Sequence, residues 1–204
     1  MKENYDRIMM KEIAVITEEG SIRPELLLHS CCGPCSTAVI ERLIEYFNVT
    51  VFFYNPNIDN AEEYEHRKSE QIRYIKERYI NGEVKFCEGP YDTESFLSFA
   101  ENMKNEPEGG SRCTLCFDLR IRTTAKEAVN NNFGIFATTL TVSPMKNAEL
   151  INEVGLKIGE EYGVKYLVSD FKKRAGYQRS LELSKQYNLY RQHFCGCSFA
   201  AELQ

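Results

Sequence analysis

Residues 26–35 read Leu-Leu-Leu-His-Ser-Cys-Cys-Gly-Pro-Cys, an apolar run closed by a turn that carries three cysteines. Apolar side chains then recur at helical spacing over residues 36–47. This stretch predicts a strand, a tight turn and a helix. Because parallel strands need long crossover connections, which helices usually supply, a parallel sheet is the expected context.

The same alternation continues along the chain. Strands separated by helices predict an α/β fold, an open and mostly parallel sheet with helices on both faces. Ligands bind such sheets outside the carboxyl ends of the strands, so the turns that follow the strands are expected to meet at one rim. The expected strands are 26–30, 49–54, 84–87, 135–140 and 164–169, and the expected helices are 36–47, 60–79, 96–103, 113–131, 147–162 and 177–187.

The composition indicates one globular catalytic domain, which we place at residues 26–204 after an N-terminal extension of residues 1–25. The chain has 204 residues, of which 43% are apolar and 27% charged. It contains no uninterrupted apolar run of the roughly 18 residues that a membrane helix needs, and its N-terminal residues are too charged for a signal peptide. A cytoplasmic protein with no membrane partner is therefore expected.

The formal net charge of −5 argues against broad binding to phosphate backbones, because Lys and Arg supply most non-specific affinity for nucleic acids. A local basic patch remains compatible with this charge. The candidate phosphate contacts are Lys172, Lys173, Arg174 and Arg179, with Arg120 and Arg122 if their helix flanks the site.

Cysteine placement carries the strongest functional signal. In a reducing compartment, clustered thiols among the eight cysteines indicate metal binding or redox catalysis rather than structural disulfides. Cys31 and Cys32 lie in the turn after the first strand, and Cys113 and Cys116 form a C-x-x-C pair. Four thiolates suit zinc or an iron–sulfur cluster, and a vicinal pair at the ligand rim of an α/β sheet favours the cluster.

Two further cysteine pairs leave alternatives open. Cys32 and Cys35 form a C-x-x-C before a helix, as in a thiol-disulfide oxidoreductase, and a zinc-binding module that recognises RNA is a third reading. Cys195 and Cys197 flank a glycine and are expected to form a redox-active dithiol, although one of them, or Cys35, is also a candidate metal ligand. Cys87 is expected to be a core residue.

Several stretches together resemble the QueH family of epoxyqueuosine reductases. The resemblance runs from about residue 26 to residue 197 and rests mainly on residues 27–35, 54–58, 112–120 and 195–197. It also includes Thr139-Leu140, Ser143-Pro144, Asp170-Phe171-Lys172 and Tyr190-Arg191-Gln192.

The resemblance implies a fold like that of PP-loop-type (HUP) nucleotide-binding proteins and reduction of epoxyqueuosine to queuosine at a tRNA wobble position. It also implies a [4Fe-4S] cluster on Cys31, Cys32, Cys113 and Cys116, a redox-active pair of Cys195 and Cys197, and an additional iron that Cys35 is a candidate to bind. The electron donor is not identified by any of these residues.

Deoxygenation of an epoxide consumes two electrons and two protons, so a redox cofactor and a proton donor are required. The candidate donors next to the predicted turns are Asp118, Asp170, His29 and Tyr54. Arg112, which precedes Cys113, is expected to neutralise thiolate charge at the cluster.

Overall fold

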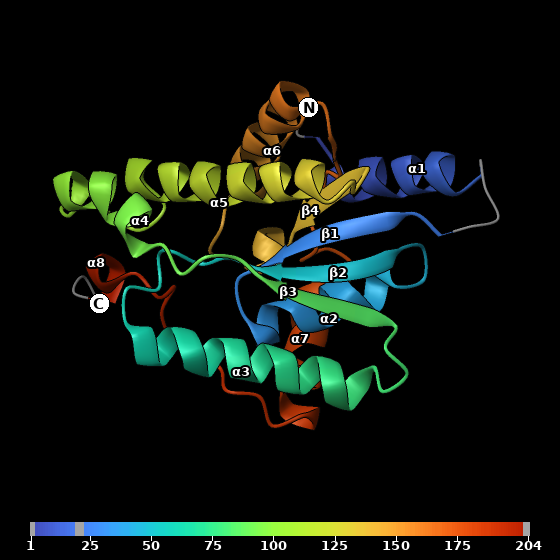
Figure 1. Cartoon of the computed structure of the whole chain (residues 1–204), viewed down its shortest axis with the longest axis horizontal. Helices are drawn as coiled ribbons and strands as arrows, with labels where there is room; N and C mark the ends of the chain where they lie inside the picture. Colours follow the sequence, from blue (N-terminus) through green and yellow to red (C-terminus); the bar gives the residue numbers. More distant parts are fainter. Residues whose placement is uncertain (1–2, 19–22, 202–204) are drawn as a thin grey trace.

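The computed structural model describes residues 3–18 and 23–201 of the chain. Its centre is a five-stranded, all-parallel sheet with the order β3-β2-β1-β4-β5, which confirms the predicted α/β class (Figure 1). Its topology is compatible with the PP-loop-type fold. The strands are β1 Glu25–Ser30, β2 Asn48–Phe53, β3 Val84–Glu88, β4 Ile135–Thr138 and β5 Lys165–Tyr166.

Helices cover both faces of the sheet, with α5 and α6 on one side and α2, α3 and α7 on the other (Figure 1). Alternation along β1 divides the core, since Leu26 and Leu28 join one apolar cluster and Leu27 joins the other. The helices are α1 Tyr5–Glu18, α2 Gly33–Leu43, α3 Ala61–Arg78, α4 Thr93–Ala100, α5 Ser111–Asn130, α6 Ala148–Tyr162, α7 Gly176–Gln186 and α8 Ser198–Ala201, with 3₁₀ turns η1 at Glu101–Met103 and η2 at Thr139–Val142.

Helix α1 packs against the rest of the chain. Its Met9 and Ile13 are buried in the same apolar cluster as Leu26 and Leu28, and Glu12 lies 3.7 Å from Lys165 of β5. Residues 19–22 lie outside the described part, and the domain boundary at residue 25 stays a prediction. Among the described residues, no helix is long and apolar enough to cross a membrane.

Two expected strands are shorter than predicted. Residues 139 and 140 belong to η2 rather than to β4, because the Thr138 hydroxyl accepts a hydrogen bond from Leu140 N and starts a 3₁₀ turn. The last strand ends at Tyr166 and does not extend to Ser169 as predicted. Both backbone groups of Ser169 bond instead to the side chain of buried Asn152 of α6, at 2.8 and 2.9 Å.

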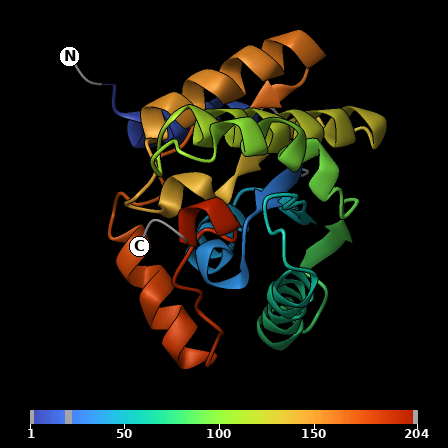
Figure 2. The ribbon, with the colours of Figure 1, turned by 90° about the vertical axis from the view of Figure 1, so that its left-hand side faces the viewer.

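The carboxyl ends of β1, β2 and β4 meet at one rim, as expected for a parallel sheet. Figure 2 looks toward this rim, and α8 lies in front of it. The segment that leads into α8 contains Cys195 and Cys197, so the C-terminal cysteines come to the same side of the molecule as the turn after β1.

Candidate metal and redox site at the strand ends

The turn between β1 and α2 gathers three sulfurs. Cys31 follows the last residue of β1, Cys32 is the N-cap of α2, and Cys35 lies in the first turn of that helix, which Pro34 helps to start. The three Sγ atoms lie within 4.8 Å of one another, and those of Cys31 and Cys32 are 3.9 Å apart. Three converging thiols can hold one metal ion or part of a cluster.

Helix α3 packs against this turn. The buried Gln71 Oε1 accepts hydrogen bonds from Ser30 Oγ at 2.7 Å and Ser36 Oγ at 2.9 Å, one on each side of the cysteines. A Cβ at Gly33 would lie 3.5 Å from Gln71 N, so the turn packs directly on the α3 backbone. Gln71 therefore fixes both ends of the cysteine turn.

The three thiols do not titrate alike. Hydrogen bonds from Cys32 and Cys35 lower the pKa of Cys31 well below its ordinary value. Burial, followed by the hydrogen bond to Cys31, raises the pKa of Cys32 to about 12, and the same kind of bond raises the pKa of Cys35. Cys31 is therefore the thiol that deprotonates first.

A polar network lies behind Cys31 on the α5 side of the sheet. Arg120, which is 1% exposed, donates to Asn55 Oδ1 at 2.6 Å and to His29 Nε2 at 3.3 Å. His29 Nδ1 lies 2.8 Å from Thr138 Oγ1. Burial, and then the Arg120 charge, lower the pKa of His29 to about 3, so this imidazole is neutral. Arg120 supplies a buried positive charge near the thiols.

Two adjoining cavities open at the rim. The larger one, of about 400 Å³, is lined by Cys31 and Cys35, and the smaller one, of about 100 Å³, is lined by Cys113, Cys116 and Cys197. Both share the residues Glu108, Met145, Lys146 and Cys195. Of the seven clustered cysteines, all but Cys32 line one or both of these cavities, and the Cys32 sulfur lies 3.9 Å from that of Cys31.

The predicted ligand set is not one tight group of sulfurs. Cys31 and Cys32 lie with Cys35, whereas Cys113 and Cys116, in the first turns of α5, line the smaller cavity. Burial raises the pKa of Cys116 to about 12 and also raises that of Cys113. The assignment of the four as ligands stays a prediction that this arrangement accommodates.

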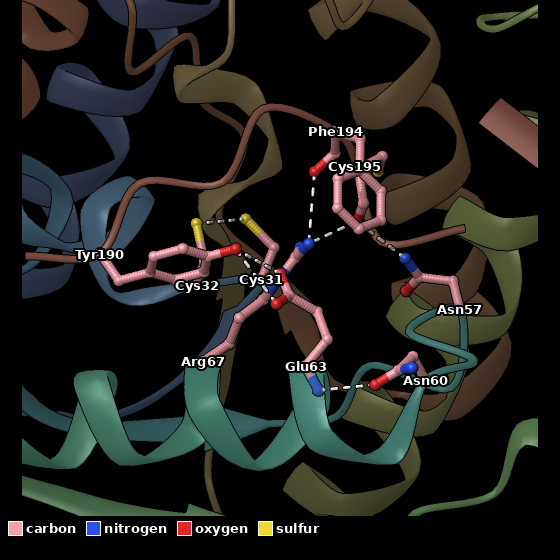
Figure 3. A network of polar contacts seen from close by, with 9 residues as sticks. All are labelled: Cys31, Cys32, Asn57, Asn60, Glu63, Arg67, Tyr190, Phe194 and Cys195. Atoms are coloured by element: carbon pink, nitrogen blue, oxygen red, sulfur yellow. Dashed lines mark hydrogen bonds and ion pairs between the residues drawn. The ribbon is translucent and has the colours of Figure 1, made fainter. Parts of the chain in front are cut away.

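The C-terminal segment forms the remaining wall. Asn57 Nδ2 and Arg67 Nη1 both donate to the carbonyl of Cys195, at 3.2 and 3.1 Å, and Figure 3 shows this carbonyl between the two side chains. The Arg67 guanidinium also pairs with Glu63 at 2.6 Å. Side chains of residues 191–195 face the larger cavity from this segment.

Cations without a carboxylate partner lie at the rim, where Arg112, Lys146 and Arg191 line the cavities and Arg120 is buried behind Cys31. Within the described ranges, no ion pair joins a carboxylate to Arg112, Arg120, Lys146 or Arg191. Arg112 is 1% exposed, and its Nε and Nη2 make no hydrogen bond in the described structure. The nearby sulfurs of Cys195 and Cys31 raise the pKa of Lys146 against the opposing effect of burial. These charges suit an anionic group between the thiols.

The predicted proton donors lie elsewhere. His29, Tyr54, Asp118 and Asp170 are absent from the lining of both cavities among the described residues. His29 and Tyr54 are buried beneath the rim, and Asp118 pairs with Arg122 on the surface of α5. Asp170 lies 3.2 Å from Lys172.

The predicted phosphate contacts are mostly engaged with acids. Arg174 pairs with Asp6, and Arg179 pairs with Glu41. Arg120 is buried, so the phosphate contact suggested for it is wrong. Cys87 is partly buried against the core, with its Sγ 3.6 Å from the carbonyl of Val51, as expected for a core residue.

Comparison with known proteins places this chain in a family. Residues 26–203 match the family Epoxyqueuosine reductase QueH. The chain belongs to the QueH family. The Epoxyqueuosine reductase QueH of Staphylococcus epidermidis is 43% identical over 207 residues, covering 100% of this chain and 87% of the relative. That of Streptococcus pyogenes serotype M1 is 42% identical, covering 100% and 80%, and that of Thermotoga maritima is 35% identical, covering 86% and 89%.

In this QueH chain, sequence reasoning missed the residues that surround the thiols. Gln71 and Arg67 lie in a highly charged helix, where a polar residue ordinarily faces solvent, so nothing in the local pattern marks them as buried. Lys146 and Gln192 had a weak signal, since Lys146 follows the Ser143-Pro144 turn after a strand and Gln192 belongs to the Tyr190-Arg191-Gln192 stretch. Only the tertiary structure brings these four to the site.

Proposed function

We propose that this chain reduces epoxyqueuosine in tRNA to queuosine, using a [4Fe-4S] cluster held by Cys31, Cys32, Cys113 and Cys116. The observation that carries the proposal is that Cys31, Cys113 and Cys116 line two adjoining cavities at the strand ends of a QueH family member, with Cys32 directly beside Cys31. The names of the relatives support the proposed reaction, and the thiols in the cavity linings support this site for it.

The chemistry of the donor set supports the cluster. Cysteine thiolates are the usual ligands of iron–sulfur clusters, and a cluster with four of them carries net negative charge. The unsatisfied Nε and Nη2 of Arg112, in the lining of the smaller cavity, are buried donors that such an anion would satisfy. Cys35, within 4.8 Å of the Cys31 and Cys32 sulfurs, is the thiol available to an additional iron.

The overall reaction sets what the chain must supply. Conversion of an epoxide to an alkene takes up two electrons and two protons and releases one water. When bound, the cluster would supply electrons one at a time, and an additional iron would supply Lewis acidity. The protein's own tasks are then to bind the nucleoside, to exclude water and to donate protons.

Lys146 is the best-placed proton-bearing side chain. It lines both cavities, and its raised pKa keeps its Nζ protonated at neutral pH. A protonated ammonium donates a hydrogen bond to an oxygen on which negative charge develops. We assign Lys146 the role of stabilising the departing epoxide oxygen.

The larger cavity suits an extruded nucleoside. Enzymes that modify a base take it out of the stack and read it in a pocket. Tyr177, Arg191, His193 and Phe194 line this cavity and offer stacking surfaces and hydrogen-bond donors. Arg191, which has no carboxylate partner among the described residues, is available to RNA at the entrance.

Iron analysis and a substrate assay test the proposal together. Anaerobically purified protein is expected to be brown, to hold about four irons per chain, and to convert epoxyqueuosine-containing tRNA when a reductant is supplied. Cys113→Ala should lose iron and activity, whereas Cys87→Ala should retain both. A colourless chain that binds zinc stoichiometrically, and no iron, after reconstitution would reject the cluster.

A thiol-disulfide oxidoreductase is the second candidate, because the Cys32 and Cys35 sulfurs already lie within 4.8 Å. Under this alternative, Cys32→Ala with Cys35→Ala abolishes disulfide reductase activity and Cys113→Ala leaves it intact. Loss of iron in Cys113→Ala, together with no disulfide reductase activity in the parent chain, would reject this alternative and support the epoxyqueuosine reductase.

A further inference from the structure

One face of α3 holds the C-terminal segment, residues 187–198, against the site. Glu63, His66, Arg67, Glu70 and Arg73 follow the three- and four-residue spacing of a helix face. Arg73 donates to the carbonyls of Tyr187 and Asn188, each at 3.1 Å, and Glu70 accepts from Tyr190 N at 2.7 Å. These hydrogen bonds are made to main-chain atoms of the segment, so they fix its path.

Among these side chains of α3, Arg67 makes the contacts nearest to Cys195 and Cys197. It is 2% exposed, and besides Cys195 O it donates to Phe194 O at 3.4 Å, with its guanidinium 5.1 Å from the Phe194 ring centre (Figure 3). From the other side, Ser198 N and Oγ both donate to Asp59, at 2.9 and 2.6 Å. The backbone is therefore anchored on both sides of the Cys195-Gly196-Cys197 turn.

Gly196 lets this anchored turn reverse direction sharply. Its φ of +105° is one that residues with a side chain rarely adopt. A Cβ there would lie 2.8 Å from Ile58 Cγ1 and 3.1 Å from Arg67 Nη1. The two cysteines are thus presented from a fixed bend that rests directly on Arg67.

The bend places the two sulfurs in different surroundings. Cys195 is partly exposed and lines both cavities, including the larger one that opens to solvent. Cys197 is 7% exposed, lines only the smaller cavity, and packs with Phe96 and Cys116 in an apolar cluster. A reagent that enters through the larger cavity meets Cys195 first.

We propose that Cys195 is the thiol that exchanges with the external reductant, that Cys197 is the thiol that leaves when their disulfide is broken, and that Arg67 is the positioning residue that maintains this difference. The proposal rests on the proposed function and deepens it, because it assigns how Cys195 and Cys197, predicted from the sequence to be a redox-active pair, receive the electrons for the reduction.

The exchange balances with a dithiol such as dithiothreitol. One thiolate of the reductant attacks Cys195 Sγ, the Cys195–Cys197 bond breaks, and Cys197 leaves as a thiolate that takes up a proton. The second thiolate of the reductant then displaces Cys195, which is protonated in turn. The reductant becomes a cyclic disulfide, and the chain gains the two electrons and two protons that one epoxide reduction consumes.

Alkylation of the full, reduced chain tests the asymmetry directly. A short pulse of N-ethylmaleimide, followed by peptide mass spectrometry, gives the labelling rates of Cys195 and Cys197 separately. We expect Cys195 to react roughly tenfold faster or more. In addition, Cys197→Ser should form a mixed disulfide with oxidised glutathione quickly and Cys195→Ser slowly. Equal rates, or faster labelling of Cys197, would overturn the assignment.

Variants of α3 test the positioning role. In Arg67→Met the ratio of the two labelling rates should fall toward one, and Arg67→Lys should restore part of it. Arg73→Met is the matched control, because it removes contacts to the same segment seven residues before Cys195 and should leave the ratio unchanged. A ratio in Arg67→Met equal to that of the parent chain, in protein with native circular dichroism, contradicts the role of Arg67.

Labelling before and after anaerobic reconstitution with iron and sulfide separates this proposal from the previous one. If the chain binds no iron but Cys195 is still labelled fast, the assignment of Cys195 and Cys197 is supported and the cluster is rejected. If the chain binds iron and reduces epoxyqueuosine, yet both cysteines are labelled equally, the proposed function is supported and the assignment is rejected.

Discussion

The buried amide of Gln71 gives a sharp prediction about the cysteine turn. Its Oε1 accepts from Ser30 Oγ and Ser36 Oγ, while its Nε2 has no hydrogen-bond partner in the described structure. The two hydroxyls have other acceptors in reach, since Ser30 Oγ lies 3.3 Å from Cys32 O and Ser36 Oγ lies 2.8 Å from Gly33 O. Loss of Gln71 therefore leaves each serine hydroxyl with another acceptor, whereas loss of both serine hydroxyls leaves Gln71 Oε1 without a donor.

This asymmetry sets the magnitudes. Gln71→Leu removes two net hydrogen bonds of about 0.5–1.5 kcal/mol each, but apolar burial of the leucine offsets part of the loss, so we expect a decrease of about 1 kcal/mol in unfolding free energy. The pair Ser30→Ala with Ser36→Ala leaves the whole Gln71 amide buried and unpaired. We expect that pair to lose about 3 kcal/mol.

The triple variant provides the decisive comparison. Adding Gln71→Leu to the two serine changes removes the unpaired amide and should recover about 1–2 kcal/mol. Urea unfolding of the reduced, metal-free chain at neutral pH measures all four proteins, and equal m-values check that they unfold alike. A triple variant no more stable than the double one would refute the reasoning, because the amide would then not be what makes the double variant unstable.

Three further predictions concern the cations and the bend. Arg112→Met should lower the reduction potential of the reconstituted cluster by on the order of 50 mV, since it removes a buried positive charge, as measured by anaerobic redox titration. Gly196→Ala should cost about 2–3 kcal/mol in urea unfolding, because a positive φ and the 2.8 Å approach to Ile58 Cγ1 act together, whereas Gly82→Ala, with φ +78° and no atom within 4 Å, should cost about 1 kcal/mol. Arg191→Gln should raise the KM for tRNA roughly fivefold with kcat little changed, whereas Arg174→Gln, which loses a residue already paired with Asp6, should not.

Each of these has an outcome that contradicts it. An unchanged potential in Arg112→Met would mean that its charge does not reach the cluster. Equal losses at Gly196 and Gly82 would mean that Ile58 and Arg67 yield to a methyl group. Equal KM values for the Arg191 and Arg174 variants would remove Arg191 from the RNA entrance.

The fold was predictable wherever local pattern and tertiary demand agree. The apolar run before Cys31 becomes the central strand β1 of the sheet, as its position before the cysteine turn predicted. Prediction failed where a side chain takes over backbone bonding. The strand after Val164 is cut short because Asn152, distant in sequence, binds both backbone groups of Ser169.

The site was predictable at the level of its thiols but not of its charges. Turns after parallel strands meet at one rim, so Cys31 and Cys32 could be placed there from the sequence. The basic run at 172–174 attracted attention as a charge cluster, yet acids pair with Lys172 and Arg174. The useful cations, such as Lys146 and Arg112, are isolated in the sequence, and what distinguishes them is the lack of a nearby carboxylate.

The lack of carboxylate partners also reconciles the acidic net charge of the chain with the proposed cluster and the proposed RNA substrate. Outside the rim, acids neutralise many surface cations, including Arg122 and Arg179. At the rim the neighbours that raise the pKa of Lys146 are thiols instead of carboxylates, and Cys195 is the neighbour that raises it most. Within the described residues, cations of the rim such as Lys146 and Arg112 are therefore not neutralised by acids, and an anionic group that enters the space between the thiols meets positive charge.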